Sequence, residues 1–167
     1  KSFIVDADKC TACQLCVIAC KDEHVGRGYA PWSAPQPDTG LRERAFGVFE
    51  GLTWAEIERD HPVQSERWRR RDSEFGPEGG ETLADFYARC VDCVSTLARR
   101  HPGEVLAVVA HGGVLDCLYR AATRVDLRAP RSWQLGNASI NRLLHTPQGL
   151  TLVGWADTGH LDELVHD

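Results

Sequence analysis

The sequence predicts an α/β fold preceded by a short cysteine-rich segment. An unbroken apolar run, Val105–Ala110, ends on His111-Gly112-Gly113, and apolar residues then recur at helical spacing to Thr123. This pattern is typical of a strand buried on both faces of a parallel sheet, followed by a helix. Residues 81–100 carry an apolar stripe with helical period, and two strand-like runs follow at 137–145 and 150–155. Strands and helices in this order indicate a mixed α/β class.

Composition excludes several classes of protein. The 167 residues are 43% hydrophobic and 26% charged, with a net charge of -5, as in a globular domain. Arg69, Arg70 and Arg71 form the one basic cluster, which argues against nucleic acid as a partner. No apolar run reaches membrane-spanning length, so we expect a cytoplasmic protein without a membrane span. The chain begins at Lys1 and lacks methionine, so we expect a processed chain or a piece of a longer one.

The strongest local motif is a C-x2-C-x2-C-x3-C run formed by Cys10, Cys13, Cys16 and Cys20. Thiolates spaced in this way can face the corners of one iron–sulfur cube, whereas a structural zinc usually takes two cysteine pairs on separate loops. Four cysteines in eleven residues and an odd total of seven do not suit a disulfide framework. We therefore predict one [4Fe–4S] cluster on these four residues, with free thiols as the alternative.

The surrounding residues, Phe3–Lys9 and Lys21–His24, resemble the first cluster motif of ferredoxin-type [4Fe–4S] subunits. Such electron-transfer subunits partner molybdopterin oxidoreductases, so the resemblance implies a redox partner protein for residues 1–40. The chain has no second cysteine run, so Cys20 must ligate the same cluster or stay unused. Pro31, Pro35 and Pro37 then mark an extended connector, and we place the domain boundary at Gly40/Leu41.

Local signals predict the elements of residues 41–167. Thr53 and Glu56 form a T-x-x-E capping box for a short helix that stops before His61-Pro62. Residues 64–80 are polar and predict a loop, and Pro102-Gly103 end the helix over 81–100. The link Thr146–Gly149 is short and turn-like, so the last two strands are expected to pair as a hairpin.

The three remaining cysteines are predicted to pack rather than react. Cys90 and Cys93 form a C-x-x-C pair in the middle of the helix over 81–100, whereas a redox pair of the thioredoxin type sits at a helix start. Cys117 falls on the helix after His111 and receives the same interpretation.

Residues 41–167 resemble the histidine phosphatase superfamily, in its phosphoglycerate-mutase-like branch. The matching pieces are Leu41–Gly47, Phe49–Gly51, Pro77–Thr82, Ala110–Gly113, Asn137–Ser139 and Trp155–Asp157. The resemblance implies an α/β sandwich acting on a small phosphorylated metabolite through a phosphohistidine. His111 matches the second catalytic histidine, which binds the phosphoryl oxygens, and Glu43 matches the acid that protonates the leaving oxygen. From the local sequence alone, Glu43 is a solvated carboxylate beside two arginines. By the same local reading, His111 is either a turn residue or a ligand-binding residue between the carboxyl end of a strand and the start of a helix.

The chain departs from this family in one respect. The family opens with a strand ending in Arg-His-Gly, whose histidine is the nucleophile, and these 167 residues contain no Arg-His-Gly. The absent strand is also central, so Val105–Ala110 is expected to lack a neighbour. The predicted fold is thus an incomplete phosphoglycerate-mutase-like sandwich after a ferredoxin-like cysteine loop. Three interpretations compete: a phosphatase-type chain inactive without its nucleophile, an electron-transfer module, and a chimeric chain with no integrated function.

Overall fold

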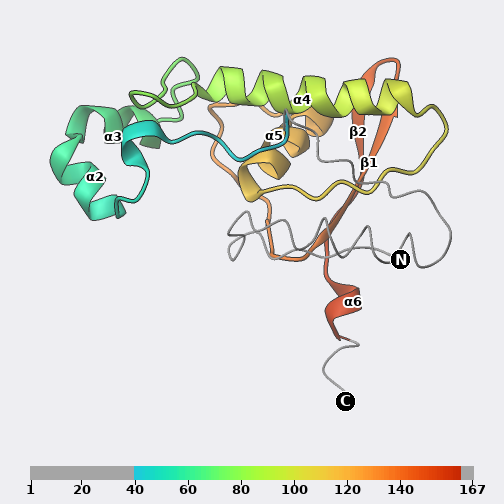
Figure 1. Ribbon diagram of the computed structural model, residues 1–167. Helices are drawn as coiled ribbons and strands as arrows, with labels where there is room; N and C mark the ends of the chain where they lie inside the picture. The colour runs from blue at the N-terminus through green and yellow to red at the C-terminus, as the bar shows by residue number, and fades with distance from the viewer. Residues whose placement is uncertain (1–39, 163–167) are drawn as a thin grey trace, which may run out of the picture.

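The computed structural model describes residues 40–162, and the predictions for residues 1–39 lie outside that range. The order of elements is η2 (Gly47–Phe49), α2 (Trp54–Asp60), α3 (Pro62–Arg69), α4 (Leu83–Arg100), α5 (Gly112–Thr123), β1 (Ile140–Thr146), β2 (Gly149–Asp157) and α6 (Gly159–Asp162). Figure 1 shows α4 running along the top of the molecule, with α2 and α3 beside its start and the hairpin β1–β2 toward its end. Within the described range, no helix is both long and apolar enough to cross a membrane.

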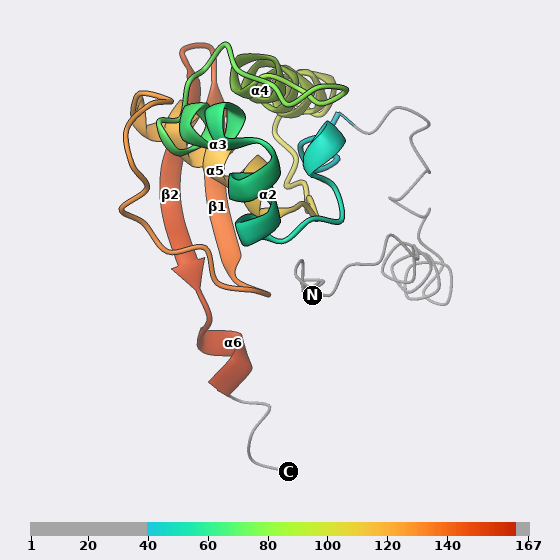
Figure 2. The ribbon, with the colours of Figure 1, turned by 90° about the vertical axis from the view of Figure 1, so that its left-hand side faces the viewer.

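The main core forms where α5 packs between α4 and the hairpin. Phe86 and Cys90 from α4 meet Val114, Cys117 and Leu118 from α5, and Leu150 from β2 completes the cluster. Burial of the five helical side chains follows the predicted apolar faces of the two helices. Figure 2, turned by 90°, shows α5 lying against β1 and β2 with α4 above.

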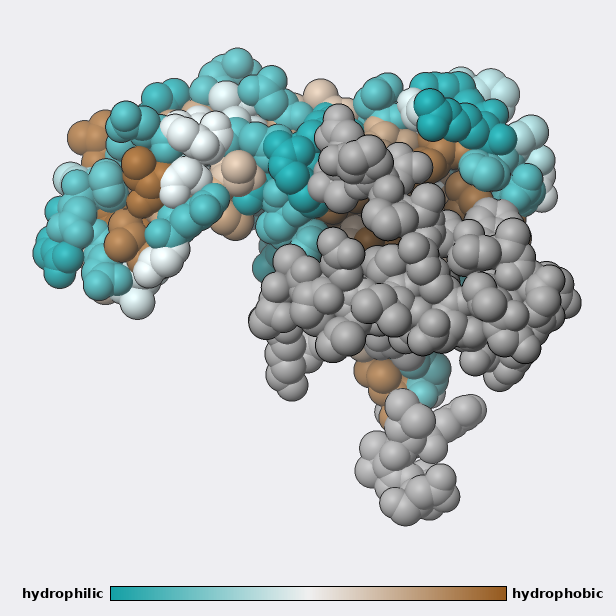
Figure 3. All heavy atoms as spheres, viewed as in Figure 1, coloured by the Kyte–Doolittle hydropathy of each residue, from teal (hydrophilic) through white to brown (hydrophobic). Residues whose placement is uncertain are grey.

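A second, smaller core holds the α2–α3 end of the molecule. Phe49, Ile57 and Phe75 are buried there, and Phe46 and Trp68 pack against them. The rings of Phe49 and Trp68 meet edge to face with centroids 5.9 Å apart, a favourable geometry for aromatic pairs. Figure 3 shows hydrophobic atoms at the surface of this end, where Val48 and Val63 are exposed.

Most predicted elements are confirmed. Thr53 and Glu56 make both hydrogen bonds of the capping box, and α2 ends at Asp60 as expected. Helix α4 begins after the N-cap Thr82, whose hydroxyl accepts a hydrogen bond from the Asp85 amide. Strands β1 and β2 pair antiparallel as a hairpin, with the turn residue Gly149 at a φ of 111°.

The predicted loop over residues 64–80 is wrong at its start, where α3 occupies Pro62–Arg69. This helix is polar on most sides, so it has no apolar stripe to reveal it. Its support comes from other sources: Pro62 suits the first helical turn, and Arg70 just beyond the end pairs with Glu66 at 2.6 Å. Trp68 anchors the helix to the second core.

The run Val105–Ala110 does not form the buried strand that its sequence predicts. It lies between α4 and α5 without a sheet partner among residues 40–162, whose only sheet is the hairpin. Val105 is 95% exposed, and Val108 and Val109 are 42% and 45% exposed. The expected burial of this run is therefore wrong for the described residues.

Candidate active site at the amino terminus of α5

Glu43 is held at the start of α5 by two backbone groups. The Gly113 N–H donates to Oε2 at 2.9 Å, and the Arg44 N–H donates to Oε1 at 2.8 Å. Gly113 lies in the first turn of α5, where unpaired N–H groups and the positive end of the helix dipole favour an anion. Glu43 is therefore half-buried and fixed, in contrast to the solvated carboxylate that its local sequence suggests.

His111 is the N-cap residue of the same helix. Its backbone is extended, with φ −91° and ψ 165°, and its carbonyl accepts the Leu115 N–H at 3.0 Å. The imidazole makes no capping hydrogen bond to the helix. Since His111 and Gly113 are two residues apart, the structure brings His111 and Glu43 to the same helix terminus. That terminus can bind an anion such as a phosphate.

The segment that carries Glu43 is anchored by the buried Arg44. Its Nη2 donates to the carbonyl of Phe75 at 2.8 Å, and its Nε donates to the carbonyl of Glu81 at 3.1 Å. The guanidinium carbon also lies 4.2 Å from the centre of the Trp68 ring. Burial lowers the pKa of Arg44 to about 10, although the Glu81 carboxylate opposes this shift, and the group stays charged at neutral pH.

A second anchor joins residues 40–45 to α4 through Glu81. Its carboxylate accepts from Arg89 at 2.7 and 2.8 Å, from Arg42 at 3.0 Å and from the Ala45 N–H at 3.1 Å. Arg89 further donates to the carbonyls of Gly40 and Arg42. This clamp holds the backbone of the residues on both sides of Glu43. The local sequence does not predict these long-range hydrogen bonds. The one available signal is the place of Glu81 within the Pro77–Thr82 motif.

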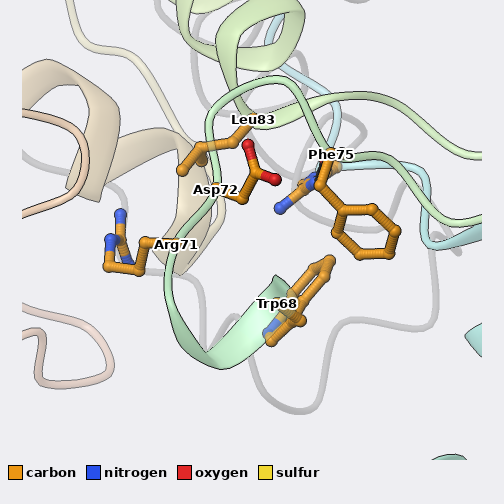
Figure 4. Close-up of a pocket in the computed structure, with 6 residues that line it drawn as sticks. Trp68, Arg71, Asp72, Phe75 and Leu83 are labelled. Atoms are coloured by element: carbon orange, nitrogen blue, oxygen red, sulfur yellow. Dashed lines mark hydrogen bonds between the residues drawn. The ribbon is translucent and has the colours of Figure 1, made fainter. Parts of the chain in front are cut away.

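A cavity lies beside Arg44. Figure 4 shows Trp68, Arg71, Asp72, Phe75 and Leu83 around it, and Arg44 completes the lining. The Asp72 carboxylate accepts from Arg67 Nε at 2.8 Å, which holds the pKa of Asp72 below its usual range. Neither Glu43 nor His111 lines this space, so it is separate from the candidate site.

The described cysteines belong to the packing of the molecule. Cys90 and Cys117 are buried at the α4–α5 contact as free thiols. A hydrogen bond between these thiols and burial both raise the pKa of Cys117, which keeps it protonated. Residues 40–162 contain no group of three or more side chains placed to hold a metal ion. The predicted cluster ligands Cys10, Cys13, Cys16 and Cys20 lie outside the described residues.

Comparison with known proteins identifies a matching family and several similar proteins. The sequence profile of the histidine phosphatase superfamily (branch 1) matches residues 26–158, starting upstream of the boundary expected at Gly40/Leu41. The chain is 31% identical to a metal-independent phosphoserine phosphatase of Arabidopsis thaliana, over 81% of this chain and 55% of the relative. It is 34% identical to a glucosyl-3-phosphoglycerate phosphatase of Mycobacterium tuberculosis, over 64% of this chain and 51% of that protein. The chain thus spans about half the length of the curated relatives it matches.

Solved structures agree with this comparison. YhfR from Bacillus stearothermophilus superposes with a TM-score of 0.66 at 26% identity, covering 74% of this chain and 62% of that one. A mycobacterial glucosyl-3-phosphoglycerate phosphatase in complex with VO3 gives 0.59 at 32% identity, covering 72% and 64%. The resemblance to the histidine phosphatases is therefore confirmed in sequence and in fold.

Proposed function

The chain belongs to the histidine phosphatase superfamily, and we propose that it carries the phosphate-binding and proton-donating part of a phosphomonoester hydrolase or phosphoryl-transfer site. One observation supports this most directly: the Glu43 carboxylate accepts the Gly113 N–H in the first turn of α5, the helix whose N-cap residue is His111. A phosphate bound there gains the helix dipole and unpaired N–H groups. His111 would bind its oxygens, and Glu43 would protonate the leaving oxygen.

We further propose that these 167 residues alone bind phosphate without turning over a phosphomonoester. No Arg-His-Gly occurs in the sequence, and the histidines on described elements lie elsewhere: His61 and His101 flank α3 and α4, His145 is on β1 and His160 on α6. Loss of a covalent nucleophile typically lowers rates by about 10³ to 10⁶.

The test uses orthovanadate and p-nitrophenyl phosphate. We expect orthovanadate to bind the whole chain, with binding lost in His111→Ala and kept in the control His145→Ala, as measured by calorimetry. We also expect no phosphate release from p-nitrophenyl phosphate. Equal binding by both variants would contradict the role of His111. Substantial turnover, or a phosphohistidine detected by mass spectrometry, would contradict the predicted inactivity.

The substrate class is proposed as a small phosphorylated metabolite. Two similar proteins are named for phosphoserine and for glucosyl-3-phosphoglycerate, both of which carry a phosphate ester on a small polar molecule. Competition of phosphoserine and inorganic phosphate with orthovanadate would measure how much the group bearing the phosphate adds to affinity. Equal affinity for the two would show that the chain binds the phosphate alone.

A [4Fe–4S] cluster on Cys10, Cys13, Cys16 and Cys20, serving a redox partner, is a second and separate proposal. Its support is the cysteine spacing alone. Anaerobic reconstitution with iron and sulfide should give a brown protein whose visible absorption bleaches on reduction. A colourless protein after reconstitution would favour the interpretation of residues 1–40 as a chimeric addition without redox function.

A further inference from the structure

Two free thiols lie side by side where α4 packs against α5, the contact seen in Figure 2. Cys90 is fully buried and Cys117 is 1% exposed, and both belong to the main core with Phe86, Val114 and Leu118. The two thiols share a hydrogen bond. A single thiol can pack in such a core as a small apolar group, whereas two thiols in contact can also form a covalent bond.

The thiol pair lies one helical turn from the candidate site. Gly113 and Cys117 are four residues apart in α5, so they lie on the same face of the helix. A Cβ at Gly113 would lie 2.2 Å from Glu43 Oε1, so this face is turned toward Glu43. The negative charge of Glu43 is also among the charges that act on both thiols.

The two helices that carry the cysteines also carry two supports of Glu43. On α4, Arg89 directly precedes Cys90 and donates to the carbonyls of Gly40 and Arg42. On α5, the Gly113 N–H donates to the Glu43 carboxylate. A covalent link between Cys90 and Cys117 would therefore hold these two supports in a fixed relation to each other.

We propose that Cys90 and Cys117 form a reversible disulfide that locks α4 to α5 when the chain meets a hydroperoxide. The Cys90 sulfur attacks one peroxide oxygen and the O–O bond breaks, which leaves a sulfenic acid on Cys90 and releases an alcohol or water. The Cys117 sulfur then attacks the Cys90 sulfur, the S–O bond breaks, and water leaves with the proton of the Cys117 thiol. The two thiols lose two electrons and the peroxide gains them. A dithiol reductant reverses the lock.

The surroundings of the pair give its two members different roles. The hydrogen bond from Cys117 lowers the pKa of Cys90, and the Arg89 guanidinium lowers it further against the opposing effect of burial. The same hydrogen bond and burial raise the pKa of Cys117. Since the thiolate is the form that attacks, Cys90 reacts first and Cys117 resolves the sulfenic acid. Burial makes the reaction slow, because the oxidant must enter a packed contact.

The disulfide should stabilise the fold and hold the start of α5 in place. It would close residues 91–116 into a loop and so restrict the unfolded chain, and we expect the Tm to rise by about 10 °C. The Gly113 amide exchanges its hydrogen only when it leaves Glu43. We expect this exchange to slow by about tenfold in the oxidised chain, because the link suppresses local opening of the α4–α5 contact.

The first experiment identifies the bond in the whole chain. The protein is treated with hydrogen peroxide, its remaining thiols are blocked with N-ethylmaleimide in acid, and its peptides are sequenced by mass spectrometry. We expect Cys90 joined to Cys117. Cys93→Ser is the matched control and should keep this bond, because a Cβ at Gly40 would lie 2.7 Å from the Cys93 sulfur, which places that sulfur against Gly40.

Two outcomes of the first experiment would overturn the proposal. One is a bond from Cys117 to any cysteine other than Cys90. The other is a Cys90 and a Cys117 that both stay reduced at a peroxide dose that oxidises the remaining cysteines of the folded chain.

The second experiment compares the oxidised and reduced chains by thermal unfolding and by hydrogen exchange. Cys90→Ser and Cys117→Ala receive the same peroxide, so they account for oxidation elsewhere in the chain, and circular dichroism checks their folding. Both variants should lose the gain in Tm and the slower exchange at Gly113. Equal Tm and equal exchange in the oxidised and reduced forms of the unchanged chain would overturn the lock. Neither measurement involves phosphate, so the result is independent of the proposed phosphatase function.

Discussion

At the scale of single residues, the candidate site depends on the absence of a side chain at residue 113. The Glu43 carboxylate accepts the Gly113 N–H, and a Cβ at Gly113 would lie 2.2 Å from Glu43 Oε1 and 3.0 Å from Oε2, so the carboxylate would have to move. At Gly112, by contrast, an added Cβ meets no atom within 4 Å. Within the His-Gly-Gly motif, only Gly113 thus lies where a larger side chain would contact Glu43, and Gly112 has free space around it.

Gly113→Ala should displace Glu43 from the helix end. We expect a net loss of about 1–2 kcal/mol in the free energy of unfolding, because the loss of the carboxylate's backbone hydrogen bonds outweighs the gain in helix propensity from alanine. Gly112→Ala should be neutral or stabilise the helix by a few tenths of a kcal/mol, since alanine favours a helix over glycine. Urea unfolding of the two variants measures the difference. Equal losses in both would show that Glu43 can move aside freely.

At the scale of elements, the clamp between Glu81 and α4 makes stability depend on pH. Burial raises the pKa of Glu81, but hydrogen bonds from Arg89 and the Ala45 N–H outweigh it, so the pKa is lower than usual in the folded chain. A carboxyl group with a lowered folded-state pKa stabilises the fold above its unfolded-state pKa. That stabilisation is lost as pH falls through the folded-state pKa.

Glu81→Gln keeps the size of the side chain and removes its charge. At pH 7 we expect the free energy of unfolding to fall by about 1–2 kcal/mol, since the charge-assisted bonds to Arg89 and Arg42 weaken. In strong acid the Glu81 of the unchanged chain is itself protonated, so the two proteins should approach the same stability. Urea unfolding at a series of pH values measures this convergence. A constant difference at every pH would indicate a packing effect instead.

Elements with a local signal can be predicted, and those that depend on distant partners cannot. The capping box of α2, the apolar stripe of α4 and the turn of the hairpin are all encoded within a few residues, and the structure confirms them. Helix α3 has no apolar stripe, so its sequence does not distinguish it from a loop. The run Val105–Ala110 shows the limit most clearly, because strand propensity cannot supply the partner that a sheet needs.

The candidate site, too, can be predicted from the sequence only in part. Short motifs identify Glu43 and His111, and the structure brings both to one helix end. The sequence does not identify their supports, because Arg44 bonds to a carbonyl 37 residues away and Arg89 bonds to Arg42 across 47 residues. A long polar side chain is typical of a surface, and its burial appears only once the chain is folded.

At the scale of the whole molecule, the two cores are joined through a partly buried arginine. Arg71 follows α3 and reaches the main core, where its Nη2 lies 3.0 Å from Asp116 Oδ2 and its Nε donates to the Leu127 carbonyl at 2.7 Å. Asp116 also accepts from Arg120, which is fully buried, at 2.9 Å. Arg71 thus connects the α2–α3 end to α5, and burial lowers its pKa despite the Asp116 charge.

Arg71→Met should loosen this connection without unfolding the main core. We expect a loss of about 1–3 kcal/mol, smaller than for an isolated buried pair because Arg120 still neutralises Asp116. Helices α2 and α3 should then become more sensitive to limited proteolysis, while α4, α5 and the hairpin stay protected. Arg67→Met is the matched control, since Arg67 is half-exposed and pairs with Asp72 inside the same end of the molecule. Cleavage of both variants at the same rate as the unchanged chain would contradict this prediction. The second core would then be stable by itself, and the role of Arg71 would be to neutralise Asp116 and not to join the two cores.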